Sequence, residues 1–158
     1  MILVILGTQD KQFYRLLKIV ENAKKKGIVK DNIIAQVGST EFSSDIMEIH
    51  EYIPEDNMKK LIEKADLVVC HGGVGAITDA LKMNKKVFSM ARLKMYNEHR
   101  NDHQVQLVDK FNELGYIKKI SDYDDFVREY KVLNKFKPRK PKFDNTRILE
   151  LVSNFIGK

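Results

Sequence analysis

The chain has 158 residues, of which 43% are hydrophobic and 32% are charged, and its formal net charge is +6. This size and composition are typical of a single domain, here 1–158, with its own hydrophobic core. The only cysteine, Cys70, excludes an internal disulfide, and no zinc-binding spacing of cysteine and histidine is present. The apolar run Ile2–Leu6 is too short for a signal peptide or a membrane span, so we expect a cytoplasmic protein.

Short apolar runs alternate with amphipathic segments along the chain, which predicts strands and helices in turn. In chain order we predict a strand over 2–6, a helix over 10–26, strands over 33–37 and 46–53, a helix over 55–65, a strand over 67–70, a helix over 75–83, a strand over 87–90, a helix over 101–114, an edge strand over 116–120, a helix around Phe126 and a final helix over 144–156. Ser121 with Asp124 resembles a capping pair for the helix around Phe126, and Asp144 can cap the last helix. This alternation indicates an α/β fold with a doubly wound, mostly parallel sheet covered by helices on both faces.

A glycine-rich turn between a strand and a helix is the most informative local feature. The strand ends in Cys70, and His71-Gly72-Gly73-Val74-Gly75 leads directly into the predicted helix. Glycines permit a tight turn with close backbone approach, and the first N–H groups of a helix are free to bind an anion. Asp79 follows one turn later, within reach of a sugar diol. The segment therefore suits the phosphates and ribose of a nucleotide, whereas Cys70, within its apolar run, is expected to be a core residue.

Two further polar segments follow strands of the predicted sheet, where ligands of doubly wound folds bind. Gly7-Thr8-Gln9 offers backbone N–H groups, a hydroxyl and an amide to phosphate oxygens, although a glycine at this place also commonly serves packing alone.

The other segment, Arg92–Gln104, is the densest polar cluster of the chain. Its side chains suit hydrogen bonds to sugar hydroxyls. The set Glu98, His99, Asp102 and His103 could also ligate a metal, but no second cluster completes a geometry and Arg100 adds a competing charge. A solvated loop that caps the next helix is the alternative.

Basic residues are concentrated near the C-terminal end of the chain. The segment 131–143 holds six lysines and arginines and no acidic residue, with Pro138 and Pro141 among them. It predicts an extended, solvated connector before the last helix, and attraction to anionic lipid headgroups is the alternative. Binding to nucleic acid is disfavoured, because no recognition helix is predicted.

Four segments in combination resemble the C-terminal domain of glycosyltransferase family 28. They are the Gly-Thr turn at Gly7, Gln36-Val37-Gly38-Ser39, the stretch from Ala65 to Gly75, and Asn97-Glu98 with Asp102-His103-Gln104. The likeness spans about residues 1–120. The chain also resembles the small subunits of two-subunit glycosyltransferases, both the PssE type of exopolysaccharide synthesis and the cytosolic subunit of the dolichol-linked N-acetylglucosaminyltransferase.

This resemblance implies a Rossmann-like, donor-binding domain of a GT-B enzyme that receives a UDP-sugar without a metal or another cofactor. It implies that Asp79 holds the ribose and that His103 and Gln104 contact the donor sugar. We therefore predict the following substrate-binding residues: Gly7, Thr8, Gln9, Gly72, Gly73, Val74, Gly75, Asp79, Glu98, His103 and Gln104. The family has Glu at the position of Asp79, and Gly-Lys-Pro where this chain has Asn84-Lys85-Lys86.

A GT-B site lies between two domains, and this chain supplies one. The resemblance implies a membrane-associated partner subunit that presents a lipid-linked saccharide, and hence a peripheral location at the inner face of the membrane.

The expected reaction is the inverting transfer of a hexosyl group in capsule or exopolysaccharide synthesis. The general base is expected in the partner, and His71 is the candidate within the chain, with a positioning role as the alternative. The competing hypothesis is a non-catalytic subunit that stabilises another transferase; alone, the chain could self-associate.

Overall fold

Six strands form one sheet in the order β3-β2-β1-β4-β5-β6, and all five pairings between neighbours are parallel. The structure is a computed structural model that describes residues 1–143, 150 and 153–154. The strands are β1 (Ile2–Ile5), β2 (Ile33–Gln36), β3 (Glu48–His50), β4 (Leu67–His71), β5 (Val87–Met90) and β6 (Lys118–Lys119). The predicted doubly wound α/β fold is confirmed. Apart from 150, 153 and 154, the helix predicted over 144–156 lies outside the described residues.

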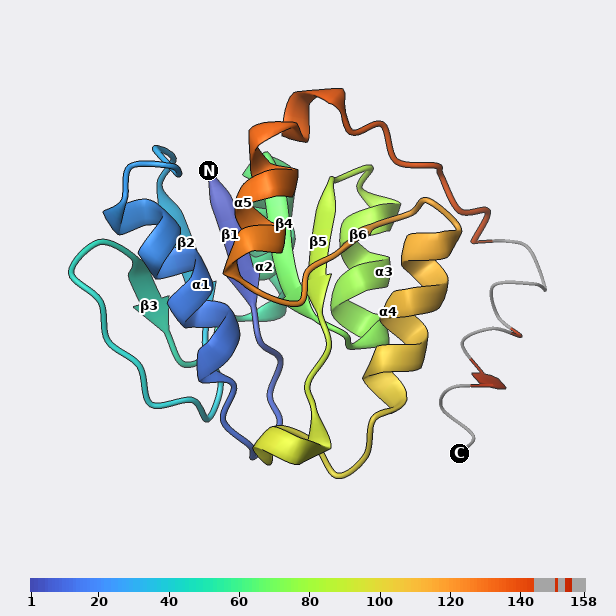
Figure 1. Cartoon of the computed structure of the whole chain (residues 1–158), viewed down its shortest axis with the longest axis horizontal. Coiled ribbons are helices and arrows are strands. Elements are labelled where there is room, and N and C mark those ends of the chain that lie inside the picture. The colour runs from blue at the N-terminus through green and yellow to red at the C-terminus, as the bar shows by residue number, and fades with distance from the viewer. Residues whose placement is uncertain (144–149, 151–152, 155–158) are drawn as a thin grey trace.

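Helices cover both faces of the sheet (Figure 1). They are α1 (Tyr14–Lys25), α2 (Glu55–Lys64), α3 (Val74–Lys82), α4 (His103–Glu113) and α5 (Tyr123–Lys131), with 3₁₀ turns η1 (Lys94–Tyr96) and η2 (Leu133–Lys135). One core joins α1 and α5 to the sheet, and a second joins α2, α3 and α4 to its other face. Alternate residues of β1 serve the two cores, Ile2 and Val4 on one face and Leu3 and Ile5 on the other. Burial on both faces explains why this strand is wholly apolar.

Tertiary hydrogen bonds hold residues that flank α1 and β3 in loops, and both elements are shorter than predicted. The backbone N–H of Phe13 donates to Thr40 Oγ1 at 3.0 Å, and α1 begins only after it. The N–H of Ile53 donates to Gln36 Oε1 at 2.8 Å, so that the chain leaves β3 early and enters α2 through Pro54. The prediction of a strand over 46–53 is therefore wrong at both ends, and its last residues lie in a loop beside the sheet.

The cap of α5 lies one residue later than predicted. Asp122 has an extended backbone (φ −152°, ψ −178°), and its side chain accepts a hydrogen bond from the N–H of Asp125 at 2.8 Å. In return, Asp125 Oδ2 accepts from the N–H of Ser121 at 3.0 Å. The predicted pair of Ser121 with Asp124 is thus wrong, because the helix begins at Tyr123 and places Asp125 at its third position.

Among the described residues, no helix combines the length and apolar character that crossing a bilayer requires. The basic segment 131–143 contains the end of α5 and η2, and from Phe136 to Phe143 it has neither helix nor strand. Its six basic side chains are exposed, and the N–H of Arg139 donates to the carbonyl of Gly115 at 2.9 Å.

Replacing the capping residue of α5 should destabilise the protein. We expect Asp122→Ala to lower the free energy of unfolding by about 1 kcal/mol, because the N–H of Asp125 loses its acceptor. The matched control is Asp124→Ala in the same turn, where only the interaction with the helix dipole is lost, at a cost of a few tenths of a kcal/mol. Urea-induced unfolding measures both, and equal effects would contradict the assigned cap.

Candidate functional site

A cleft of about 470 Å³ opens where β1, β2 and β4 end. It is lined by Ile5, Gly7, Thr8, Gln9, Gln36, Tyr52, Ile53, Glu55, Met58, Ile62, His71, Gly73, Gly75, Ala76 and Asp79. The chain passes from β1 to β2 on one side and reaches β4 on the other, so the cleft lies at the point where the strand order reverses. Ligands of doubly wound sheets bind at this switch point.

Seven of the predicted site residues share this cleft: Gly7, Thr8, Gln9, His71, Gly73, Gly75 and Asp79. A smaller hollow of about 180 Å³ adjoins it, since Gly73 belongs to both. Gly72, Val74, His103 and Gln104 line this hollow, together with His99, Asn101 and Leu107. The structure thus brings together every predicted site residue except Glu98.

The imidazole of His71 fills the space between the two glycine turns. A Cβ atom on Gly73 would lie 2.1 Å from His71 Cε1, and one on Gly7 would lie 2.6 Å from His71 Nε2. Gly7 also has φ +76°, which favours glycine by itself. By contrast, a Cβ on Gly75 would meet no atom within 4 Å. Of the glycines in the cleft, Gly75 is therefore the one whose missing side chain leaves open space.

His71 is neutral at physiological pH. Burial, with a contribution from the nearby positive charge of Arg92, lowers the pKa of its imidazole to about 3. An imidazole with that pKa is a poor base at neutral pH, because its affinity for a proton is too weak. Of the two roles predicted for His71, its burial and lowered pKa favour positioning over general base.

Asp79 lies on α3, four residues after Gly75, and both residues line the cleft. This spacing places them on the same face of the helix, one turn apart. The carboxylate is exposed to solvent. It is therefore available to a ligand, as the sequence predicted.

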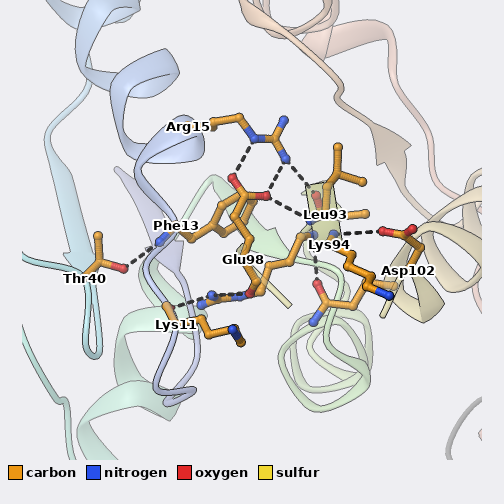
Figure 2. A network of polar contacts seen from close by, with 11 residues as sticks. Lys11, Phe13, Arg15, Thr40, Leu93, Lys94, Glu98 and Asp102 are labelled. Carbon is orange, nitrogen blue, oxygen red and sulfur yellow. Dashed lines mark hydrogen bonds and ion pairs between the residues drawn. The ribbon is translucent and has the colours of Figure 1, made fainter. Parts of the chain in front are cut away.

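Glu98 is used within the protein itself, as Figure 2 shows. Its carboxylate oxygens accept hydrogen bonds from Arg15 Nε and Nη2, both at 2.7 Å, and Oε2 also accepts from the N–H of Leu93 at 2.9 Å. The residue is 3% exposed and does not line the cleft. The structure therefore does not support the predicted contact of Glu98 with the sugar, because its carboxylate is buried in an ion pair with Arg15.

No role at the site was predicted for Arg92, yet its side chain joins the loops around the cleft. It is 1% exposed, and Nη2 donates to the carbonyl of Leu6 at 2.7 Å. Nη1 donates to the carbonyl of Lys11 at 2.8 Å and to that of Glu98 at 3.2 Å. The guanidinium thereby fixes the loop after β1 against the loop after β5. No local pattern signals this role, since arginine is rarely buried.

Tyr52 and Ile53 also line the cleft and were missed, because both were assigned to a strand. Tyr52 is 64% exposed and offers an aromatic face of the kind on which nucleobases stack. Gln36 lines the cleft too and holds Ile53 through its side-chain oxygen. Pro54 was a visible signal, since the residue before a proline is typical of an extended or turn dipeptide, which need not belong to a paired strand.

Within the described part of the chain, no three His, Cys, Asp or Glu side chains are close enough to share a metal ion. Cys70 is fully buried, and burial raises the pKa of its thiol to about 12. It is a core residue, as predicted.

The strand order and the cleft define a doubly wound α/β domain with a ligand site at the switch point of its sheet. Residues 1–149 match the family model described as the glycosyltransferase family 28 C-terminal domain. The chain belongs to this family. The resemblance inferred from four segments of the sequence in combination is thereby confirmed.

Similar proteins include the UDP-N-acetylglucosamine transferase subunits ALG13 of Candida albicans and Candida glabrata. The first is 30% identical over 87 residues, covering 52% of this chain and 28% of the relative. The second is 26% identical over 102 residues, covering 64% and 48%. This chain thus spans less than half the length of either relative.

Solved structures share the fold. The solution structure of ALG13 has a TM-score of 0.59 at 17% identity and covers 95% of this chain and 93% of that one. MurG of Acinetobacter baumannii has a TM-score of 0.53 at 20% identity, covering 84% and 39%.

Adding a methyl group at two neighbouring glycines should have opposite effects on stability. We expect Gly73→Ala to cost about 2 kcal/mol of unfolding free energy or more, because the new Cβ collides with the His71 ring. Gly75→Ala should leave stability unchanged or raise it by up to about 1 kcal/mol, since it meets no atom and favours the helix. Thermal and urea unfolding measure both, and a destabilised Gly75→Ala protein would contradict the open space at this position.

Acid should weaken the folded state through His71. The folded pKa of His71, about 3, lies below the ordinary value of 6.5, so between these pH values the unfolded chain binds the extra proton. Unfolding free energy should therefore fall by up to about 1.4 kcal/mol per pH unit as the pH drops below 6.5. His71→Asn should remove this part of the pH dependence, whereas His50→Asn, in the edge strand β3, should keep it. Chemical unfolding between pH 4.5 and 7.5 tests this, and parallel curves for wild type and His71→Asn would contradict it.

Proposed function

We propose that this chain is the donor-binding subunit of a two-subunit glycosyltransferase and that the cleft holds the UDP of a UDP-sugar. The observation that carries the proposal is the meeting of two glycine turns, Asp79 and Tyr52 in one cleft at the switch point of the sheet. Membership of glycosyltransferase family 28 and similarity to proteins named UDP-N-acetylglucosamine transferase subunits support it.

Each part of the nucleotide has a matching place in the cleft. The N-terminus of α3 and the backbone N–H groups at Gly73 and Gly75 suit the diphosphate. The exposed carboxylate of Asp79 suits the ribose diol, and the ring of Tyr52 suits the uracil. The donor sugar would then extend toward the adjoining hollow and His103.

The proposed reaction is the inverting transfer of a hexosyl group to a hydroxyl of a lipid-linked saccharide, in capsule or exopolysaccharide synthesis. The acceptor oxygen would bond to the anomeric carbon while the bond from that carbon to the β-phosphate oxygen breaks, and UDP would leave with the bonding electrons. The turns at Gly7 and Gly73 would stabilise the leaving charge, so we propose no metal cofactor. The acceptor proton would pass to a base of the partner subunit, since His71 is a poor base.

A partner subunit would complete the cleft. Large hydrophobic side chains are exposed near the loops at the carboxyl edge of the sheet: Tyr14 is 41%, Met95 76% and Tyr96 53% exposed. Tyr14 and Tyr96 line one depression there. These residues suit contact with a membrane-associated, acceptor-binding protein, and in its absence with a second copy of this chain. The peripheral membrane location that we propose for the chain follows from such a partner.

The basic segment 131–143 lies apart from this edge. Lys86, just before β5, donates through Nζ to the carbonyl of Leu133 at 2.8 Å, and Lys118 Nζ lies 5.2 Å from the ring centroid of Phe136. Figure 1 shows the segment passing the amino end of β5, the end opposite to the cleft. This placement supports a role for the segment outside nucleotide binding.

Binding of UDP to the purified chain tests the proposal. We expect calorimetry to detect UDP binding in the presence of EDTA and Asp79→Ala to weaken it about tenfold or more, because a hydrogen bond to a charged group is worth about 1.5–3 kcal/mol. The 2′-deoxy form of UDP should bind more weakly than UDP to the wild type but equally well to Asp79→Ala. Glu63→Ala, which removes an exposed carboxylate of α2 outside the cleft, is the control. A folded wild type that binds no UDP would instead favour a non-catalytic stabilising subunit.

A further inference from the structure

Gln104 is one of the few buried polar residues, and both ends of its amide are engaged. It is 7% exposed. Its Oε1 accepts a hydrogen bond from the backbone N–H of Arg92 at 3.0 Å. Because a backbone N–H can only donate, this contact fixes which end of the amide is oxygen. The nitrogen, Nε2, then faces His71 Nδ1 at 3.4 Å.

This orientation determines where His71 carries its proton. The amide NH₂ of Gln104 can only donate, so His71 Nδ1 accepts. Burial keeps the imidazole neutral, with its pKa lowered to about 3, and a neutral imidazole holds one proton. That proton is therefore on Nε2, at the edge of the ring that faces Gly7 and away from Gln104.

We propose that Gln104 is a positioning residue that acts on the bound nucleotide through His71, by holding the imidazole with its Nε2–H directed into the cleft. This inference rests on the proposed function, in which the cleft binds UDP. It replaces the expectation that Gln104 contacts the donor sugar. The Nε2–H supplies a neutral donor to an oxygen of the diphosphate, between the turns at Gly7 and Gly73.

The packing around Gln104 supports this role. A Cβ on Gly72 would lie 2.9 Å from Gln104 Cβ and 2.8 Å from Val108 Cγ2, so Gly72 is the residue that lets α4 approach the turn. Within the turn, Gly72 therefore makes room for α4 and Gly73 for the His71 ring. Two hydrogen bonds in series connect Arg92 to His71: the N–H of Arg92 donates to the amide oxygen of Gln104, and the amide nitrogen of Gln104 donates to His71 Nδ1. This series of hydrogen bonds fixes both the tautomer and the ring orientation of His71.

Binding of two ligands separates this proposal from a sugar contact. Gln104→Met keeps the volume of the side chain but removes both hydrogen bonds. We expect it to weaken UDP and UDP-N-acetylglucosamine by the same factor, about fivefold or more, because the defect lies at the diphosphate. In a His71→Asn background the same substitution should have no further effect on either affinity. The matched control is Gln106→Met, an exposed position of α4, which should change neither affinity.

The opposite pattern would overturn the proposal. If Gln104 contacts the sugar, Gln104→Met leaves the affinity for UDP unchanged and lowers only that for UDP-N-acetylglucosamine. Equal losses in the presence and absence of the His71 side chain would also overturn it, since Gln104 would then act by another route.

Long-range ¹⁵N–¹H spectra of histidine-labelled protein test the contact without any variant. The wild type should show His71 protonated at Nε2 and bare at Nδ1 from pH 5 to 8, whereas Gln104→Met should show both tautomers. A proton on Nδ1 in the wild type would overturn the proposal even if the variants fail to fold. A wild type with the expected tautomer but no UDP binding would refute the proposed function while leaving the contact between Gln104 and His71 established.

Discussion

The buried guanidinium of Arg92 is the constraint on which the site depends. A buried charge is costly unless hydrogen bonds compensate it, and Arg92 obtains them from the backbone carbonyls of Leu6, Lys11 and Glu98. These carbonyls belong to the loops that follow β1 and β5. Neither loop can move far without taking acceptors from Nη1 and Nη2 of a guanidinium whose buried Nε already has no partner. The same residue orients Gln104 through its backbone N–H and helps to keep His71 neutral through its charge.

The ion pair between Arg15 and Glu98 reinforces this arrangement at the outer side of the loop after β5. The pair is bidentate, and Glu98 also accepts from the N–H of Leu93, so the carboxylate connects α1 with both ends of the turn η1 (Figure 2). The N–H of Lys94 donates to Asp102 Oδ1 at 2.9 Å and holds the next part of the loop. A loop held in this way before a ligand arrives loses little conformational entropy on binding. The polar density that suggested sugar contacts is largely internal reinforcement.

The sequence was sufficient to predict features that depend on the residues of a single element. The apolar runs of β1, β4 and β5 predicted buried parallel strands, and the glycine-rich turn with Asp79 predicted the central part of the cleft. Prediction from the sequence failed where a contact joins residues that lie far apart along the chain. Arg15 and Glu98 are 83 positions apart, and Gln104 and His71 are 33 apart. Likewise, the boundaries of α1 and β3 depend on Thr40 and Gln36, which belong to other elements. Propensity within a segment carries no information about such partners.

The glycines of the turn serve two purposes that the sequence pattern does not distinguish. A turn with three glycines suggests room for a ligand, yet two of these glycines make room for the protein itself: Gly73 for the ring of His71 and Gly72 for the side chains of α4. Only at Gly75 is the space open. The turn therefore presents to the cleft an imidazole edge and the start of α3, and not bare backbone alone. An imidazole is a directional donor, and the hydrogen bonds from Arg92 to Gln104 and from Gln104 to His71 set its direction, so residues outside the turn decide part of the chemistry that the turn offers.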